Sequence, residues 1–410
     1  MGLQLCQLCE IAYFVTDKIP LENVLLTDYV TTDSLLPNKE GRCVAQNLPP
    51  QKCALTHYKC GDVLVANIRP YLKKIWFADR EGGASADVLV FRAKSGHSQE
   101  FLYASLLQDT FYDYVMKGKR GSKMPRGDRD QIMRYSIPKL SLAEEACIGN
   151  MILSFCTKIN VSRRINDNLE AIAKQLYDYW FVQFDFPNEE GKPYKSSGGA
   201  MVWNERLKRE IPVGWQVENL IDFAEIKNGA TPSTTDDTNY GGNIVWITPK
   251  DLSDQQSKFV YQGERNITKQ GFDSCSTSML PTNSVLMSSR APIGLVSIAK
   301  HEVCTNQGFK SFIPKNIENS IYLYYYIKHH IKQIEQLGTG TTFKEVSRDD
   351  LCKFPILVVG ANEAYKQWIE LQDKIANKQF VLKKEIAALT KQRDELLPLL
   401  MNGQASVNSD

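Results

Sequence analysis

The densest group of basic side chains in the sequence lies between Lys117 and Asp130, where six lysines and arginines accompany two aspartates. Glycines in the same stretch would let backbone amides come close to a phosphate. Clustered cations and free amides are the groups that bind the backbone of nucleic acids. We therefore expect a phosphate-binding loop with these contacts: Lys119, Arg120, Ser122, Lys123 and Arg126. A solvated loop that caps a long helix would have the same composition, and this alternative stays open.

A second loop, from Leu337 to Arg348, is rich in glycine and threonine but carries less charge. Its hydroxyls and its lysine are candidate phosphate contacts through Thr341, Thr342 and Lys344. Elsewhere, arginine suits guanine, and asparagine or glutamine suits adenine, because each pair can form two hydrogen bonds in the major groove. The further candidate DNA contacts are Arg69, Lys73, Lys74, Lys250, Ser288, Ser289, Arg290, Asn306, Gln307 and Lys310.

Motifs for catalysis are missing from the sequence. It has no Gly-x-x-x-x-Gly-Lys-Ser/Thr loop for ATP. It also has no Asn/Asp-Pro-Pro-Tyr/Phe tetrapeptide of the aminomethyltransferases, because Leu48-Pro49-Pro50 does not fit that pattern. The five histidines follow no metal-ligand spacing. We expect a chain without catalytic residues, without a bound metal and without a cofactor of its own.

Cysteines near the N-terminus leave one catalytic alternative open. Cys6 and Cys9 form a close pair, and Cys43, Cys53, His57 and Cys60 follow. A zinc-dependent nuclease is conceivable, but the spacing matches no common zinc finger. Small buried thiols are the favoured interpretation.

The sequence contains two similar segments about 220 residues apart, and such a spacing indicates an internal repeat. Tyr29-Val30-Thr31 resembles Trp246-Ile247-Thr248, and Asp62 to Pro70 resembles Ser284 to Pro292. The Gly121 loop likewise resembles the Gly340 loop. Short β-branched runs at 63–65, 88–91, 285–287 and 293–298 predict strands. Residues 99–116 and 317–336 are expected to be helical.

Two further stretches show apolar residues at alternating steps of four and three. The first runs through Ile148, Ile152, Phe155, Ile159, Ser162, Asn166, Leu169, Ala173, Leu176 and Trp180. The second runs through Trp368, Gln372, Ile375, Gln379, Leu382, Ile386, Leu389, Arg393, Leu396 and Leu400. This spacing predicts helices that pair as a coiled coil, with polar positions that fix register. Alternatively, each helix packs only on its own globular part.

Length and composition fit a folded protein with several domains. The 410 residues exceed what one hydrophobic core usually serves. The net charge of +2 indicates that any DNA-binding surface must be local. With no apolar run of about 20 residues and no signal peptide pattern, we expect a cytoplasmic protein with reduced cysteines. The expected parts are a first recognition domain at 1–139, a helical region at 140–186, a connector at 187–210, a second recognition domain at 211–358, a second helical region at 359–402 and a disordered tail at 403–410.

These features imply an α+β protein in which two α/β domains are separated by two long helices. If the helices pair antiparallel, a pseudo-two-fold axis relates the two copies, and such proteins read DNA half-sites. Because the copies differ in sequence, the expected target is bipartite and asymmetric.

Several segments resemble the specificity subunits of type I restriction-modification enzymes. Ile137 to Glu145 is similar to that family's Ile-Pro-Leu-Pro-Pro-Leu-x-Glu-Gln run. The other similar segments are Asn166 to Glu170 with Ala173, Tyr179 to Phe186, Gly191 to Gly199, and Ile211 to Trp215. The sequence departs from the family pattern at Phe354 to Val358, which lacks the double proline.

The resemblance implies two target-recognition domains and two paired helical regions. It implies double-stranded DNA, two modification (methyltransferase) subunits and the restriction subunits as partners. S-adenosylmethionine, ATP and magnesium would be held by those partner subunits. A coiled-coil adaptor that binds proteins but not DNA is the alternative, and it predicts no salt-dependent DNA affinity.

Overall fold

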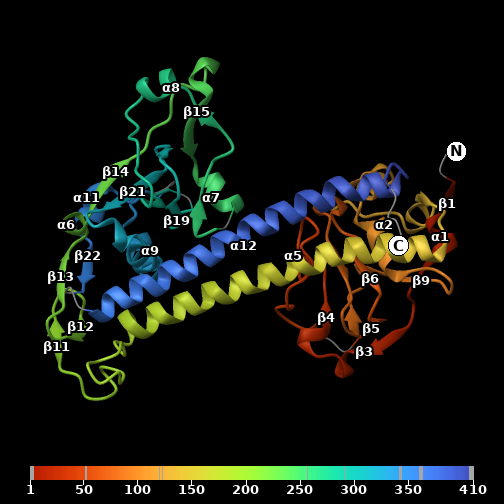
Figure 1. The fold of residues 1–410 in the computed structure, drawn as a ribbon, viewed down its shortest axis with the longest axis horizontal. Helices are drawn as coiled ribbons and strands as arrows, with labels where there is room; N and C mark the ends of the chain where they lie inside the picture. Colours follow the sequence, from red (N-terminus) through yellow and green to blue (C-terminus); the bar gives the residue numbers. More distant parts are fainter. Residues whose placement is uncertain are drawn as a thin grey trace. The chain divides into compact units, whose positions relative to one another are not determined.

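The computed structural model describes residues 4–50, 53–119, 121, 123–255, 257–290, 292–340, 344–359 and 363–405. The chain divides into two compact units (Figure 1). Unit 1 comprises Met1–Asp167 with Phe380–Asp410, and unit 2 comprises Asn168–Gln379. The long helices α5 (Leu142–Tyr177) and α12 (Glu363–Met401) each contribute residues to both units.

Unit 1 contains two four-stranded sheets. The first has the order β2-β9-β6-β7 and is antiparallel throughout. Its strands are β2 (Ala12–Phe14), β6 (Val63–Ala66), β7 (Ile75–Phe77) and β9 (Val88–Ala93). The second has the order β3-β5-β8-β4. Its strands are β3 (Lys18–Pro20), β4 (Tyr29–Val30), β5 (Ala54–Tyr58) and β8 (Gly82–Ala84).

Two short helices cover the first sheet of unit 1. They are α2 (Gln99–Leu107) and α3 (Asp109–Lys117), and the predicted single helix over 99–116 is therefore wrong in one respect. The chain breaks at Gln108, whose backbone is extended at φ −64° and ψ 144°. Leu106, Leu107, Phe111 and the strand residues form the buried apolar core beneath them.

The long helix α5 begins at a capping box. The backbone amide and the hydroxyl of Ser141 both donate to Glu144, at 2.8 and 2.6 Å. One residue further on, the buried carboxylate of Glu145 accepts hydrogen bonds from the Ser98 amide and lies 2.9 Å from the His97 ring nitrogen. These contacts fix the start of α5 against α2. Before it come α1 (Leu8–Ile11), α4 (Arg129–Ile132) and the pair β1 (Leu5–Gln7) and β10 (Ser136–Pro138).

Unit 2 is built around a five-stranded sheet with the order β14-β21-β18-β19-β16. Its strands are β14 (Ala224–Asn228), β16 (Phe259–Val260), β18 (Val285–Ser288), β19 (Val296–Ala299) and β21 (Phe309–Pro314). A smaller sheet contains β15 (Tyr240–Ile247), β17 (Asn266–Ile267) and β20 (Cys304–Thr305). A further pair joins β13 (Gln216–Asn219) to β22 (Pro355–Val358). The short helices are α6 (Leu220–Phe223), α7 (Pro249–Gln255), α8 (Lys269–Asp273), α9 (Ser320–His329), α10 (Ile331–Leu337) and α11 (Arg348–Lys353).

The two units use the same order of elements. The strand order β14-β21-β18-β19 corresponds position by position to β2-β9-β6-β7. In both units two helices, a short helix, an edge strand and a long helix then follow along the chain. The strands predicted at 63–65, 88–91 and 285–287 are present, while the run at 293–298 forms a strand only from Val296. The helix predicted at 317–336 is divided at His330, whose backbone leaves the helical conformation.

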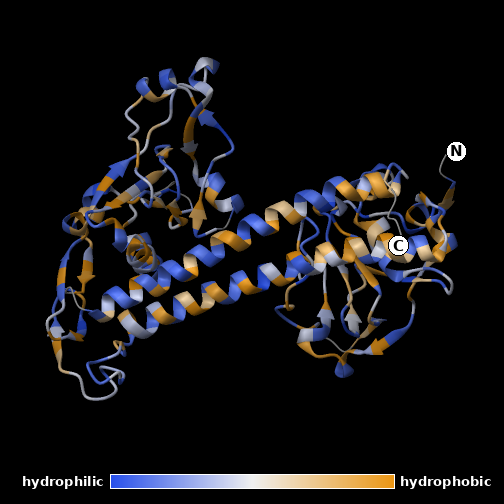
Figure 2. Cartoon of the chain, in the orientation of Figure 1, coloured by the Kyte–Doolittle hydropathy of each residue, from blue (hydrophilic) through white to orange (hydrophobic). Residues whose placement is uncertain are grey.

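The long helices contact each other in each unit and run in opposite directions there. In unit 1, Lys158 forms an ion pair with Glu385 at 2.9 Å, and Arg393 lies against the Cys156 sulfur. In unit 2, the Gln372 side chain donates to the Ala173 carbonyl at 3.0 Å. Figure 2 shows hydrophobic and hydrophilic residues alternating along both helices. The predicted seam positions are all buried or half-buried, so the periodic pattern identified the inner faces.

The segment predicted as an exposed connector is more ordered than its composition indicated. Within 187–210 lies strand β11 (Met201–Asn204), which pairs with β12 (Arg209–Pro212). Tyr194 stacks on Phe186 with ring centroids 4.7 Å apart. None of the residues 187–210 is fully buried, so the segment is exposed as predicted, and its breaker residues mark turns between short ordered stretches. The predicted tail overlaps residues 406–410, which lie outside the described residues.

Candidate nucleic-acid interface

The basic loop of unit 1 is held by main-chain hydrogen bonds to the segment that follows β6. Ile68 and Arg126 form an antiparallel bridge, and the Arg69 amide donates to the Pro125 carbonyl at 2.8 Å. Gly127 lies against this segment so closely that a Cβ atom would come within 2.8 Å of the Asn67 side chain. Residues 125–127 are thus held against the segment 67–69, and the next residue, Asp128, caps α4.

Among the described residues of this loop, the basic side chains are exposed. Lys119, Lys123 and Arg126 are exposed, and Arg69 on the neighbouring segment is exposed as well. Arg126 forms an ion pair with Asp87 at 3.1 Å, yet about half of its side chain (54%) remains accessible. Beside the loop lies an open hollow of about 520 Å³, which is lined by Arg126 and Arg129 but also by Asp128 and Asp130. This combination of exposed cations and a shallow hollow can accept a phosphate chain. The predicted contacts Arg120 and Ser122 lie outside the described residues.

Two other lysines predicted as DNA contacts hold the fold of unit 1 together. The Lys73 ammonium is 2.8 Å from the Asp109 carboxylate, and the Lys74 ammonium donates to the Thr32 carbonyl at 2.5 Å. Both side chains are half-buried. We therefore leave them out of the interface.

Unit 2 fastens its counterpart loop at the corresponding place. Arg290, two residues after the end of β18, forms an antiparallel bridge with Glu345, and the Val346 amide donates to the Ser289 carbonyl at 3.0 Å. The two loops differ in charge. Glu345 holds the bridge position in unit 2 that Arg126 holds in unit 1. Lys344 is exposed beside it, whereas the predicted contacts Thr341 and Thr342 lie outside the described residues.

Glu345 joins two of the predicted DNA contacts into one ion-pair cluster. Its carboxylate is 2.9 Å from Arg290 and 3.2 Å from Lys310. Burial raises the pKa of Glu345, but the hydrogen bonds and charges of Arg290 and Lys310 outweigh it and leave the pKa below its ordinary value. Arg290 keeps nearly half of its side chain exposed (47%), so it can still reach a ligand.

Three predicted contacts in unit 2 are corrected by their burial. The Ser288 hydroxyl donates to the Pro292 carbonyl at 2.6 Å, and the Ser289 hydroxyl donates to the Gly308 carbonyl at 3.2 Å. Both serines are fully buried, and Lys310 is 9% exposed at its side chain. Side chains that are buried and bonded in this way cannot touch DNA without a rearrangement.

The remaining predicted residues of unit 2 differ in their exposure. Gln307 is exposed, and its carbonyl oxygen accepts from the Thr231 hydroxyl. Asn306 is half-buried and accepts from the Gly308 amide at 2.9 Å. Lys250 is exposed and forms a surface ion pair with Glu264 at 2.7 Å.

One group of candidate side chains was missed by sequence reasoning. Arg265 stacks over the Tyr240 ring at 4.0 Å, next to Gln262 and Asn266, around an open hollow of about 640 Å³. Arginine, glutamine and asparagine are the residue types that read base edges. Their placement on either side of the glycines at 241, 242 and 263 is the only sequence signal that pointed to them.

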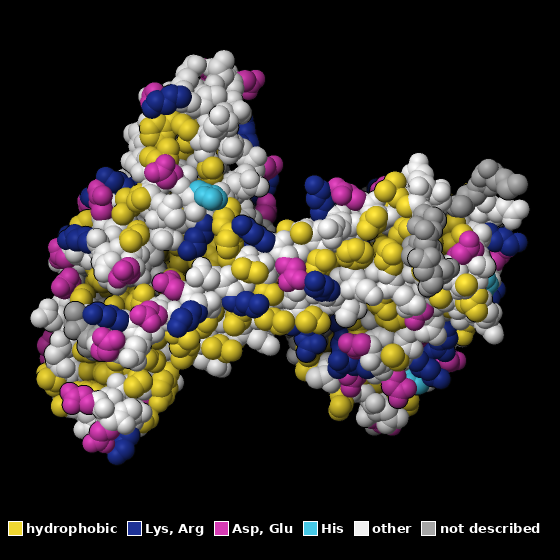
Figure 3. All heavy atoms as spheres, viewed as in Figure 1, with side chains coloured by type: hydrophobic (Ala, Val, Ile, Leu, Met, Phe, Trp, Pro, Cys, Tyr) yellow, Lys and Arg dark blue, Asp and Glu magenta, His cyan; other side chains and the backbone are white. Residues whose placement is uncertain are grey.

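Figure 3 shows one face of the molecule in space-filling form. On the part of this face formed by each unit, Lys and Arg side chains alternate with Asp and Glu rather than forming an uninterrupted basic area. A DNA contact on such a surface would depend on a few fixed cations. Within the described ranges, no group of three or more His, Cys, Asp or Glu side chains is placed to hold a metal ion. None of the helices in the part of the chain described is long and apolar enough to cross a bilayer.

Comparison with known proteins identifies the class of domain. Residues 212–398 match the family model of the type I restriction modification DNA specificity domain. The chain is related to the specificity subunits of type I restriction enzymes, which confirms the resemblance drawn from the sequence.

Two curated relatives and one solved structure illustrate this relationship. The MjaIX specificity subunit of Methanocaldococcus jannaschii is 40% identical over 159 residues, which cover 38% of this chain and 37% of that protein. The HindI specificity subunit of Haemophilus influenzae is 24% identical over 92% of this chain and 94% of its own. The crystal structure of a type I restriction-modification S subunit from M. genitalium has a similar fold, with a TM-score of 0.64 and 12% identity over 98% of this chain and 96% of that one.

Proposed function

We propose that this chain recognises a bipartite, asymmetric DNA target as the specificity subunit of a type I restriction-modification complex. Each unit would read one half of the target. The supporting observation is that both units fasten a loop at the same place after corresponding strands, but with Arg126 in one loop and Glu345 in the other. Loops with equal anchoring and unequal charge are suited to reading unequal half-sites.

The long helices would pair as an antiparallel coiled coil that relates the two units by a pseudo-two-fold axis. The opposite directions of α5 and α12 within each unit support this proposal. Such a pair would keep the half-sites a fixed number of base pairs apart. Cytoplasmic location follows from the same role.

The chain would perform no catalysis itself. It would hold two modification subunits, which carry S-adenosylmethionine and methylate adenine, and would recruit restriction subunits that use ATP and magnesium. The lack of a P-loop and of the aminomethyltransferase tetrapeptide in the sequence supports this division of labour.

Salt-dependent DNA binding tests this proposal against the adaptor alternative. The chain, purified with its modification subunits, should bind DNA with an affinity that falls steeply between about 50 and 200 mM salt, because phosphate contacts release counterions. The measurement is a fluorescence anisotropy titration on a duplex at several salt concentrations. An assembled complex with no DNA affinity at low salt would favour a protein-only adaptor.

A further inference from the structure

A buried lysine of unit 2 connects the strand-rich region to both long helices. Lys258 lies between α7 and β16, and its side chain is only 5% exposed. Its ammonium group is 2.8 Å from the Glu170 carboxylate on α5 and 3.2 Å from the Gln379 side-chain oxygen on α12. A single side chain thus contacts both long helices and joins them to the strand-rich region of the unit.

Lys258 is buried among aromatic rings, while its partner Glu170 keeps 32% of its side chain exposed. Its ammonium group lies 4.8 Å from the Tyr325 ring centroid and 5.7 Å from that of Phe259. Glu170 also accepts hydrogen bonds from the Tyr325 hydroxyl and the Gln379 amide, both at 3.2 Å. Burial lowers the pKa of Lys258, whereas the charge of Glu170 opposes this shift. This network accounts for one of the polar interruptions in the helix seam, because Gln379 bonds to both members of the ion pair.

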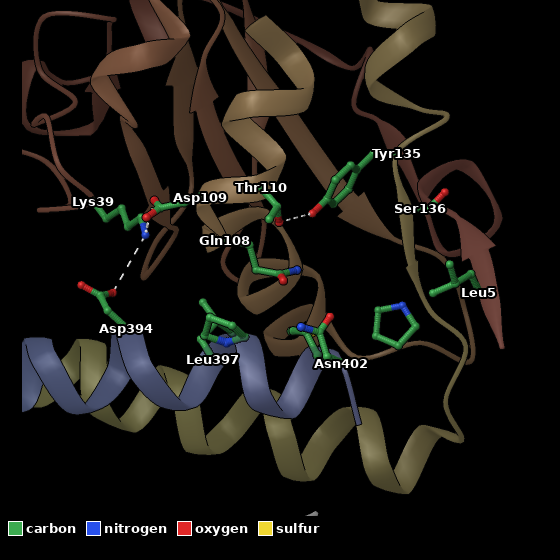
Figure 4. A pocket seen from close by; sticks show the side chains of 13 residues that line it. Leu5, Lys39, Gln108, Asp109, Thr110, Tyr135, Ser136, Asp394, Leu397 and Asn402 are labelled. Carbon is green, nitrogen blue, oxygen red and sulfur yellow. Dashed lines mark hydrogen bonds and ion pairs between the residues drawn. The ribbon is translucent and has the colours of Figure 1, made fainter. Parts of the chain in front are cut away.

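Unit 1 has a similar contact in the corresponding part of its chain. The Lys39 side chain is 7% exposed, lies 2.8 Å from Asp109 and 3.9 Å from Asp394 on α12, and borders a pocket of about 360 Å³ (Figure 4). The next residue, Glu40, forms an ion pair with Arg163 on α5 at 2.9 Å.

The backbone of unit 1 is strained at Lys39. Lys39 has a φ of 63°, in the left-handed region that favours glycine. Its amide donates to the Lys73 carbonyl at 2.9 Å, which holds the turn in this conformation. A lysine kept in a strained turn and directed inward is more than a solvated surface residue.

We propose that Lys258 in unit 2, and Lys39 with Glu40 in unit 1, are positioning residues that set the orientation of each strand-rich region on the two long helices. Apolar packing alone is non-directional, whereas an ion pair with hydrogen bonds fixes one geometry. The two lysines are buried but their carboxylate partners are partly exposed (32% for Glu170 and 58% for Asp109), so these pairs add little net stability, although a buried polar group can specify a single arrangement. This inference rests on the proposed function only in that the oriented surface is the one that meets DNA.

The test in unit 2 compares Lys258→Met with the double variant Lys258→Met/Glu170→Gln in the full-length chain. Distances are measured in the absence of DNA between spin labels carried by non-canonical amino acids at Lys269 and Lys374, two exposed positions of unit 2. The single variant should broaden the distance distribution and lower the Tm, because Glu170 loses its ion-pair partner and keeps only the hydrogen bonds from Tyr325 and Gln379. The double variant should regain Tm, since no unpaired charge remains, but should keep the broad distribution.

A positioning role is separated from a purely structural one if the double variant regains the Tm while its distance distribution stays broad. Lys250→Met is the matched control, because it removes an exposed ion pair of the same unit and should leave the distribution narrow. A distribution that stays narrow in both Lys258 variants would overturn the inference for unit 2. A double variant that regains both the Tm and the narrow distance distribution would also overturn the inference.

The equivalent experiment in unit 1 uses Lys39→Met with labels at Lys59 and Lys391, both exposed. Broadening supports the inference, and an unchanged distribution overturns it for unit 1.

On a cognate duplex, Lys258→Met should weaken binding about tenfold and leave binding to random DNA unchanged. If the wild-type complex binds no DNA, the proposed function fails, but the distances still decide whether the lysines position the units.

Discussion

At the scale of single residues, the two candidate loops differ in how freely their charges can act. Lys119 and Lys123 are exposed in unit 1, and no acidic residue stands in the bridge that anchors their loop. In unit 2, Glu345 occupies the charges of Arg290 and Lys310. In unit 1 Arg126 also has a carboxylate partner, Asp87 at 3.1 Å, but the exposed Lys119 and Lys123 lie in the same loop. In unit 2 Arg290 and Lys310 share Glu345, so unit 1 should supply more of the non-specific affinity.

Replacing Lys123 and Arg126 by alanine should weaken DNA binding by similar factors on target and random duplexes. Phosphate contacts carry no sequence information, so specificity should be retained while the slope of log affinity against log salt becomes shallower by roughly 1 to 2. Anisotropy titrations on both duplexes measure this. Lys59→Ala, at another exposed lysine of unit 1, is the control. Unchanged affinity in the double variant would show that this loop does not bind phosphate.

Glu345→Gln should strengthen DNA binding by unit 2 and steepen its salt dependence, because Arg290 would lose its competing carboxylate. The matched change Glu264→Gln, which releases Lys250 on the surface of the same unit, should have a smaller effect because both side chains of that pair are about two-thirds exposed. Equal effects of both changes, or weaker DNA binding by Glu345→Gln, would contradict a competition between Glu345 and phosphate for Arg290.

The pKa of Glu345 gives the same cluster a pH dependence of known sign. Because the pKa is lowered by folding, the stabilising contribution is present above the ordinary glutamate pKa of about 4.3 and is lost as the pH falls through the lowered value. The stability of Glu345→Gln should therefore fall less than that of the wild type as the pH is lowered, because the variant lacks this contribution.

At the scale of elements, the two long helices and their buried faces are what the sequence predicted best. Its periodicity is local, so a spacing of four and three residues indicates the buried face without knowledge of the partner. The breaks at Gln108 and His330 were missed, because neither position carries the glycine or proline that usually marks a helix end. The strand β11 was missed because it lies within a stretch of turn residues.

Ile159→Ala should lower the stability of unit 1 by about 2–4 kcal/mol, because this seam side chain is 1% exposed and its removal leaves a cavity between the helices. Val161→Ala, two residues further along the same helix and 47% exposed, should change stability by less than about 0.5 kcal/mol. Urea unfolding followed by circular dichroism provides both values. Similar losses for the two variants would mean that the seam is not the packed face of α5.

At the scale of the whole chain, both units follow one plan of elements but present different side chains to solvent. The family model covers residues 212–398, and the Haemophilus relative extends the similarity to 92% of the chain. Sequence reasoning identified the class of protein because repeats and motifs survive as patterns in the chain. It misjudged Ser288, Ser289 and Lys310 because burial and ion pairing depend on residues distant in sequence, such as Gly308 and Glu345.

Mapping methyladenine across a genome that expresses this chain with its modification subunit tests the central proposal most directly. We predict a split motif whose two unlike halves are separated by a fixed gap. Replacing residues 211–357 with another recognition domain should change one half of the motif and keep the other. A single unbroken motif, or a replacement that alters both halves, would contradict two independent readers on one helical spacer.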